Sequence, residues 1–209
     1  MYLLRVRLPE APGSLGRVAT AIGLLGASIQ AVEIIGHQAD VAIDDFIIDL
    51  PNGTMPDTIV SACQAIEGVR VLWVSHQLAD WGVESDIAVL NHMMERPEEA
   101  AQTLTREAPI VFRSSWAALL TRSTPVQVLA ATDLAPDFPH EGVEALGDLA
   151  KPRTFELPAE WLPHWGVTII AMAPLDDVRT IVLGRQGGPA YQPSELRRLT
   201  HLAALANVG

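Results

Sequence analysis

The stretch Glu10-Ala11-Pro12-Gly13-Ser14-Leu15 joins two segments of different periodicity. Before it, residues 4–8 (LRVRL) alternate apolar and charged side chains, which is the period of a half-buried strand. The proline and glycine of the turn break the strand, and Ser14 is the expected N-cap of the helix that follows. Such a turn points backbone N–H groups outward and can receive a carboxylate or phosphate. After the turn, apolar residues recur at the spacing of one face of a helix, namely Leu15, Val18, Ala19 and Ile22.

The following residues continue in short elements that fit one small domain. Gly26 ends the helix, and residues 28–35 and 41–50 read as two strands. A second helix follows the turn at 51–53, with Thr54 at its expected start, and residues 69–74 form a fourth strand. The order strand, helix, strand, strand, helix, strand predicts a ferredoxin-like βαββαβ domain over residues 1–76.

This first part resembles an ACT domain, a small ligand-binding module found in many amino-acid-regulated proteins. The resemblance implies that an amino acid binds at an interface between two such domains, where the turn's backbone and the start of the next strand hold it. It also implies a homodimer. Leu3, Ile34 and Ile47 are expected to lie on a sheet face that the helices leave uncovered, where a second copy could pack. A plain strand-to-helix connection remains the alternative for the turn. The residues that carry the resemblance are Glu10, Pro12, Gly13, Leu15, Gly26, Ser28 and Ile29. The ligand-binding residues that it implies are Glu10, Ala11, Pro12, Gly13, Ser14, Leu15, Ser28 and Ile29.

A second part is expected over residues 86–209, after a link at 77–85. Its first expected helix begins at Asp86 and has Ile87, Leu90 and Met94 on its inner face. A second helix is expected over residues 98–107, and Pro109 is expected to end it. Residues 110–120 fit either a helix or a helix that leads into a strand, and residues 126–130 fit a strand. Loops with one short helix near 142–150 are expected over 131–163. Strands at 166–173 and 179–184 and a helix from Gln192 complete the pattern.

This second part resembles a GAF domain, a sensor module in which helices flank a central antiparallel sheet. The segments that carry the resemblance are Ala173-Pro174-Leu175, Leu183-Gly184-Arg185, Tyr191 and Ser194-Glu195-Leu196. The combined expectation is an α+β protein with a ferredoxin-like first domain and a GAF-like second domain that contains a central antiparallel sheet.

Composition excludes several classes of function. The chain has 209 residues and a formal net charge of −11, which disfavours binding to nucleic acid or to anionic membranes. Cys63 is the only cysteine, so an internal disulfide, a cysteine zinc site and a bilin attached to the second part are all excluded. The start of the chain lacks the pattern of a signal peptide, and no apolar run approaches the length of a membrane span. We therefore expect a cytoplasmic protein.

The remaining chemically suggestive residues favour neither catalysis nor a metal site. The spacing of Asp40, Asp44, Asp45 and Asp49 suits a solvated strand face better than a metal cluster. The six histidines lack metal-binding spacing, and Cys63 is expected to be an inert core thiol. Residues 184–188 are glycine-rich but lack the Lys-Ser/Thr of a phosphate loop, and Ser114-Ser115 lacks the setting of a hydrolase nucleophile. The segment Trp161-Leu162-Pro163-His164-Trp165 either lines a ligand pocket or caps a small core.

These observations predict a non-catalytic regulatory or sensor protein that binds a small ligand, most simply an amino acid, without a cofactor. The alternative is a protein-interaction subunit that regulates an enzyme or a transcription factor and has no small-molecule ligand.

Overall fold

The computed structural model describes residues 1–76, 83–138, 140–158 and 166–207. The chain divides into two compact units, Met1–Ala79 and Asp80–Gly209, which are described one at a time. Most of the expected link at 77–85 lies outside the described residues, and its last part already belongs to helix α3 (Val83–Glu95). No helix in the described part of the chain is long and apolar enough to cross a membrane.

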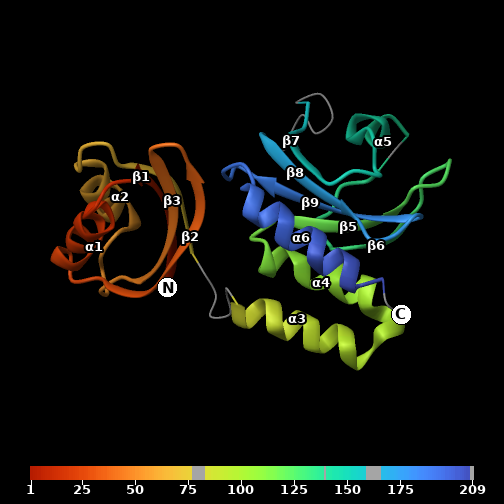
Figure 1. Ribbon diagram of the computed structural model, residues 1–209, viewed down its shortest axis with the longest axis horizontal. Helices are drawn as coiled ribbons and strands as arrows, with labels where there is room; N and C mark the ends of the chain where they lie inside the picture. The colour runs from red at the N-terminus through yellow and green to blue at the C-terminus, as the bar shows by residue number, and fades with distance from the viewer. Residues whose placement is uncertain (77–82, 139, 159–165, 208–209) are drawn as a thin grey trace. The chain divides into compact units, whose positions relative to one another are not determined.

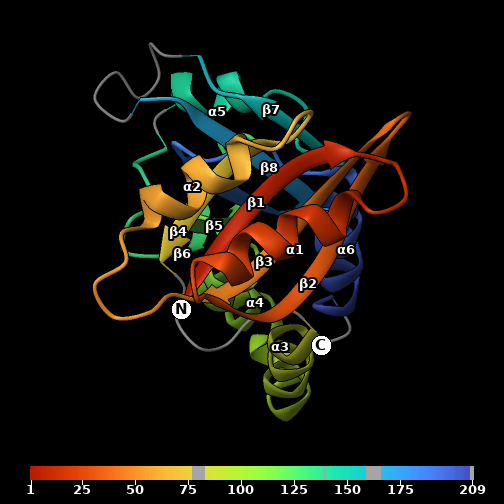
Figure 2. The same cartoon turned by 90° about the vertical axis from the view of Figure 1, so that its left-hand side faces the viewer.

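The first unit has the element order that the sequence predicts, with two helices on one face of a four-stranded antiparallel sheet of order β2-β3-β1-β4 (Figures 1 and 2). Its core lies between the sheet and the helices and contains the alternate residues Leu4, Val6 and Leu8 of the first strand. The elements are β1 (Tyr2–Pro9), α1 (Ser14–Leu24), β2 (Ser28–Gln38), β3 (Val41–Asp49), α2 (Pro56–Gln64) and β4 (Arg70–His76).

The start of α2 differs from expectation, whereas the residues expected on the uncovered sheet face lie there. Helix α2 begins at Pro56 with Met55 at the N-cap position and no side-chain cap, so Thr54 does not cap it. Leu3 and Ile47 are paired neighbours on β1 and β3, and they alternate with Leu4 and Ile48, which lie in the core under the helices. Leu3 and Ile47 therefore lie on the sheet face that the two helices leave uncovered, as expected. Ile34 is 56% exposed.

The second unit contains a five-stranded antiparallel sheet of order β6-β5-β9-β8-β7, which confirms the expected α+β class with a central antiparallel sheet. Its elements are α3, η1 (Pro97–Glu99), α4 (Ala100–Val111), β5 (Trp116–Thr121), β6 (Val128–Ala131), α5 (His140–Leu146), β7 (Arg153–Glu156), β8 (Thr168–Pro174), β9 (Arg179–Gln186) and α6 (Pro193–Leu205).

Each face of this sheet carries its own apolar core. Helices α3, α4 and α6 lie on one side, where Ala117 and Leu183 face them, while α5 lies on the other side (Figure 1). On the α5 side, Trp116 and Leu120 pack with Leu146 of α5. The strands alternate between the two cores because successive side chains point to opposite faces of a sheet.

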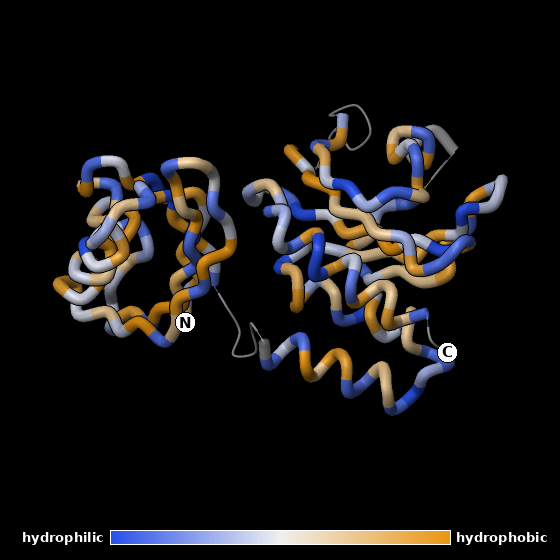
Figure 3. The backbone as a smooth tube through the Cα atoms, in the orientation of Figure 1, coloured by the Kyte–Doolittle hydropathy of each residue, from blue (hydrophilic) through white to orange (hydrophobic). Residues whose placement is uncertain are grey.

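Helix α3 buries a different face from the one expected. Val89 and Met93 are in the core, whereas Ile87 is 51% and Met94 is 76% exposed. Leu90 packs partly against the core. The helix carries apolar residues on more than one side, as the alternating colours in Figure 3 show, so its sequence period did not identify the buried face.

Two further elements were wrong or missing in the sequence prediction. Helix α4 continues through Pro109 to Val111, because the proline removes one N–H donor while the N–H of Phe112 still bonds to the carbonyl of Ala108 at 2.9 Å. Strand β7 occupies part of the segment that was expected to be loops, where it pairs with β8.

Candidate functional site

The turn at residues 10–15 is built around a glycine in the left-handed region. Gly13 has φ 85° and occupies the N-cap position of α1, and no side chain caps the helix. Ser14 is therefore the first helical residue and is buried, which corrects its expected role as the cap. Its hydroxyl accepts a hydrogen bond from the guanidinium of Arg17 at 3.2 Å. The side chains of Glu10, Ala11, Pro12 and Leu15 are exposed.

Two acidic side chains and a histidine lie near this turn. The Nδ1 atom of His37 is 2.8 Å from a carboxylate oxygen of Glu10. Asp44 is only 2% exposed, and its Oδ1 is buried without a hydrogen-bond partner among the described residues. Burial raises the pKa of Asp44 to about 6, and the negative charge of Glu10 adds to the rise, while His37 opposes it.

The structure does not bring all of the predicted site residues together within one chain. Pro9, just before the turn, pairs with Val41, whereas Ile29 pairs with Ile48, which lies opposite Tyr2 at the far end of the sheet. Tyr2 and Pro9 are seven residue steps apart along an extended strand, which corresponds to roughly 23 Å. Ser28 is exposed and Ile29 is half-buried at that far end. A site that used both the turn and the start of β2 would need two copies of the chain.

The aspartates of β3 are not the solvated face that the sequence suggested. Asp44 and Asp45 are both buried, which overturns that expectation. Asp45 accepts two hydrogen bonds from Arg5, at 2.7 and 2.9 Å, and this ion pair is fully buried. No group of three or more histidine, cysteine, aspartate or glutamate side chains that could hold a metal ion occurs in the part that the structure describes.

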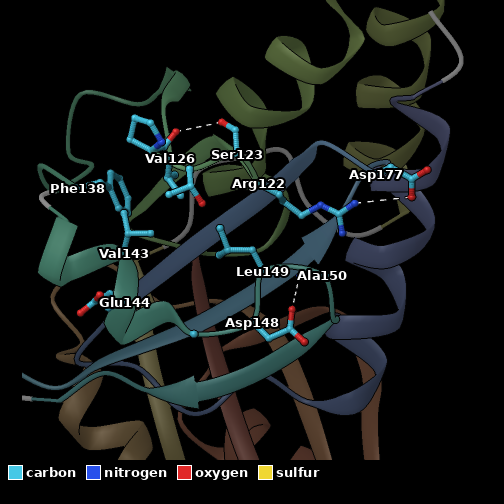
Figure 4. A pocket seen from close by; sticks show the side chains of 13 residues that line it. Arg122, Ser123, Val126, Phe138, Val143, Glu144, Asp148, Leu149, Ala150 and Asp177 are labelled. Carbon is cyan, nitrogen blue, oxygen red and sulfur yellow. Dashed lines mark hydrogen bonds and ion pairs between the residues drawn. The ribbon is translucent and has the colours of Figure 1, made fainter.

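The second unit contains an open cleft of about 830 Å³ on the α5 side of its sheet (Figure 4). Three chain segments form its walls: the loop between β5 and β6, helix α5, and residues 147–150 after that helix. Its lining residues are Arg122, Ser123, Thr124, Pro125, Val126, Phe138, Val143, Glu144, Gly147, Asp148, Leu149, Ala150 and Asp177.

Hydrogen bonds fix the segments that line this cleft. The backbone N–H of Arg122 donates to the carbonyl of Val178 at 2.7 Å. The hydroxyl of Ser123 donates to the carbonyl of Pro125 at 3.0 Å, which shapes the loop. The buried hydroxyl of Thr180 on β9 donates to the carbonyl of Leu149 at 2.7 Å and ties the opposite wall to the sheet. The cleft is therefore largely preformed.

Charged and apolar groups are both present in the cleft. Arg122 reaches toward Asp177, where the two side chains are 3.7 Å apart at their closest charged atoms (Figure 4). Asp148 accepts a hydrogen bond from the N–H of Ala150, which lowers its pKa, and the nearby Lys151 lowers it further. The apolar lining comes from Val126, Phe138, Val143 and Leu149.

Sequence reasoning missed this cleft because its walls are distant in the chain. Pairing of β5 with β9 brings Arg122 beside the turn that contains Asp177, and no local pattern records that pairing. The only available signal was a polar loop after an apolar strand, which is common in proteins. The predicted pocket segment 161–165 lies outside the described residues, so the hypothesis for its tryptophans stays a prediction.

Other residues singled out in the sequence have structural roles. Cys63 is fully buried, and burial raises the pKa of its thiol to about 11, as expected for an inert core cysteine. The hydroxyls of Ser114 and Tyr191 are 2.7 Å apart. Gly184 allows the ring of Trp116 to pack against the backbone of β9, since an added Cβ would lie 2.1 Å from that ring.

No protein-family model matches the chain. A stretch of 76 residues, 36% of this chain, is 37% identical to NAD-dependent malic enzyme 1 of Bacillus subtilis (strain 168), and it spans 17% of the length of that enzyme. Among solved structures, the chain is similar to the phycoerythrobilin-bound GAF domain of a cyanobacterial phytochrome, with a TM-score of 0.44 and 12% identity over 59% of this chain and 92% of that one. A GAF domain from a phosphoenolpyruvate-protein phosphotransferase of Coxiella burnetii has a TM-score of 0.38 and 11% identity over the same shares.

Proposed function

We propose that this protein is a non-catalytic regulatory protein that senses a small ligand, and that the cleft of its second unit is a ligand site. The preformed cleft is the observation that carries the proposal. A volume of about 830 Å³ lies within the range of small-molecule sites, and such sites combine apolar walls with a few fixed polar groups. One of the GAF domains named above binds phycoerythrobilin, so a domain of this kind can hold a small molecule.

The first unit is proposed to act as an ACT-like domain that binds an amino acid between two copies of the chain. The separation of the Gly13 turn from Ser28 and Ile29 along the sheet supports this arrangement, because one copy would supply the turn and the other the start of β2. Binding would favour one arrangement of the two copies and thereby change the protein's activity toward its partner by population shift.

The alternative function, an interaction subunit without a ligand, is favoured by the exposed apolar residues Ile87 and Met94 of α3. A partner that binds there would be lost from an affinity purification with the variant Ile87→Lys/Met94→Lys. Recovery of the same proteins with this variant and with the unchanged chain would contradict the proposal that a partner binds to this part of α3.

The test of the main proposal is calorimetric titration of the full chain with the twenty amino acids and with a set of neutral, cationic and anionic fragments. Val143→Trp fills the cleft and should abolish fragment binding, whereas Ile110→Trp, at a 61% exposed position on α4, is the matched control and should not. Gly13→Asp should abolish amino-acid binding at the turn. Absence of heat with every compound would refute ligand binding in both units.

A further inference from the structure

We propose that the cleft selects small monocarboxylates with an apolar body, with Arg122 as the group that binds the carboxylate. This inference rests on the proposed ligand site and names the chemical class that it takes. The cleft alone does not decide the class, because its walls contain both apolar side chains and charges of either sign.

Arg122 presents part of its guanidinium to the cleft. Its side chain is 17% exposed while its Nε is buried, so a ligand would meet the terminal nitrogens of the guanidinium. Its ion pair with Asp177 spans 3.7 Å, which is too long for a hydrogen bond, and the Asp177 side chain is fully exposed to water. A guanidinium presents its donors in a planar fork that fits a carboxylate. A carboxylate from a ligand would therefore form a shorter and less hydrated pair with Arg122 than Asp177 does.

The other charges in the cleft limit the charge of the ligand. Glu144, Asp148 and Asp177 line the same cleft, so its acidic side chains outnumber the single arginine among its lining residues. A phosphate monoester carries close to two negative charges at neutral pH and would be repelled more strongly than a carboxylate, which carries one. Among anions bound by Arg122, the balance of charge therefore favours one with a single negative charge over a phosphate monoester.

The apolar wall accounts for the rest of the ligand. Phe138 and Val143 lie together in the close-up view, and Val126 and Leu149 line the same cleft (Figure 4). Phe138 is held in place by an edge-to-face contact with the buried Trp116, with ring centroids 5.8 Å apart. A short aliphatic chain or an aromatic ring attached to the carboxylate would bury its surface against this wall.

The test compares four probes that share one phenyl group and differ in charge: 3-phenylpropionate, 3-phenylpropanamide, 3-phenylpropylamine and phenyl phosphate. Each is titrated into the full chain by calorimetry. We expect the carboxylate to bind at least about tenfold more tightly than the amide, which is the usual gain from a charge-assisted hydrogen bond. The amine and the phosphate ester should bind more weakly than the carboxylate.

Three variants assign the effect to Arg122. Arg122→Gln should reduce the preference for carboxylate over amide to within about twofold, and its retained binding of the amide shows that the cleft is still folded. Asp177→Asn removes the competing carboxylate and should tighten binding of 3-phenylpropionate. Arg96→Gln removes a cation that is 70% exposed near the start of η1. It is the control, and it should change neither the preference for carboxylate over amide nor the affinity for 3-phenylpropionate.

The possible failures are distinguishable. If the probes bind with equal affinity, if phenyl phosphate binds most tightly, or if the preference for carboxylate survives in Arg122→Gln, the assignment to Arg122 is wrong while the cleft remains a ligand site. If neither these probes nor the neutral and cationic fragments bind to the cleft, both this inference and the proposed ligand site are refuted.

Discussion

Replacing Asp44 by asparagine should stabilise the protein at neutral pH and leave its stability unchanged in acid. Asp44 is buried on β3, and its pKa rises to about 6 because burial and the charge of Glu10 both disfavour its ionised form. An ordinary aspartate has a pKa of about 3.9, so the unfolded chain releases this proton at lower pH than the folded protein does.

The sign and the size of the effect follow from that difference. Below about pH 3 the carboxyl is protonated in both states and has no effect on folding. Between about pH 4 and pH 6 the folded state holds more protons, so stability falls as the pH rises. Above pH 6 the loss is complete and amounts to about 3 kcal/mol, since each pH unit contributes about 1.4 kcal/mol and the pKa of Asp44 is about 6.

Urea unfolding of the full chain at about pH 3 and pH 7.5, followed by circular dichroism, measures the effect. The two units need not unfold in the same transition. Hydrogen exchange of the amides of β1 and β3 therefore identifies the transition in which the first unit unfolds. Asp44→Asn should raise the free energy of unfolding by up to about 3 kcal/mol at the higher pH and by nothing at the lower. Gly23→Ala, which changes no titratable group, is the control and should show the same effect at both pH values. An equal effect of Asp44→Asn at both pH values would refute the reasoning.

Further predictions concern packing, buried charge and thiol reactivity. Gly184→Ala places a Cβ 2.1 Å from the ring of Trp116 and should destabilise the second unit by about 2–3 kcal/mol in denaturant unfolding. Gly23→Ala, with no atom within 4 Å of the added Cβ, should instead stabilise α1 by about 0.5–1 kcal/mol. An unaltered unfolding midpoint in Gly184→Ala would contradict the packing. Arg185→Met removes the cation of a buried ion pair and should cost about 3–5 kcal/mol, and a cost below about 1 kcal/mol would show that the pair is solvated. Burial and a pKa of about 11 predict that Cys63 reacts with a thiol reagent only after unfolding, so rapid labelling of the folded chain at neutral pH would contradict its placement.

Local sequence patterns predicted the elements of the first unit because the apolar residues of β1 and α1 follow the period of each element. Leu4, Val6 and Leu8 alternate along β1, and Val18 and Ile22 recur on one face of α1, and all five lie in the core between sheet and helices. The same reasoning missed the burial of Asp45, because its partner Arg5 lies 40 positions away and only the pairing of β1 with β3 joins them.

Local sequence patterns could not predict the cleft, for a related reason. It depends on the pairing of β5 with β9 and on the hydrogen bond that ties Leu149 to Thr180, which are contacts between distant segments. The turn at Gly13 could be located from the sequence, since proline and glycine interrupt two different periods there. Its separation from Ser28 and Ile29 required the strand register.

Methyl NMR of the full chain during titration with the fragment set tests the central claim most directly, because it reports where a ligand binds. The account predicts saturable shifts for the methyl groups of Val126, Val143 and Leu149, which line the cleft, and none for Ile59 in the core of the first unit. Fragments that bind without shifting the three cleft residues, or that shift none of them at any concentration, would contradict the claim that this cleft is a ligand site.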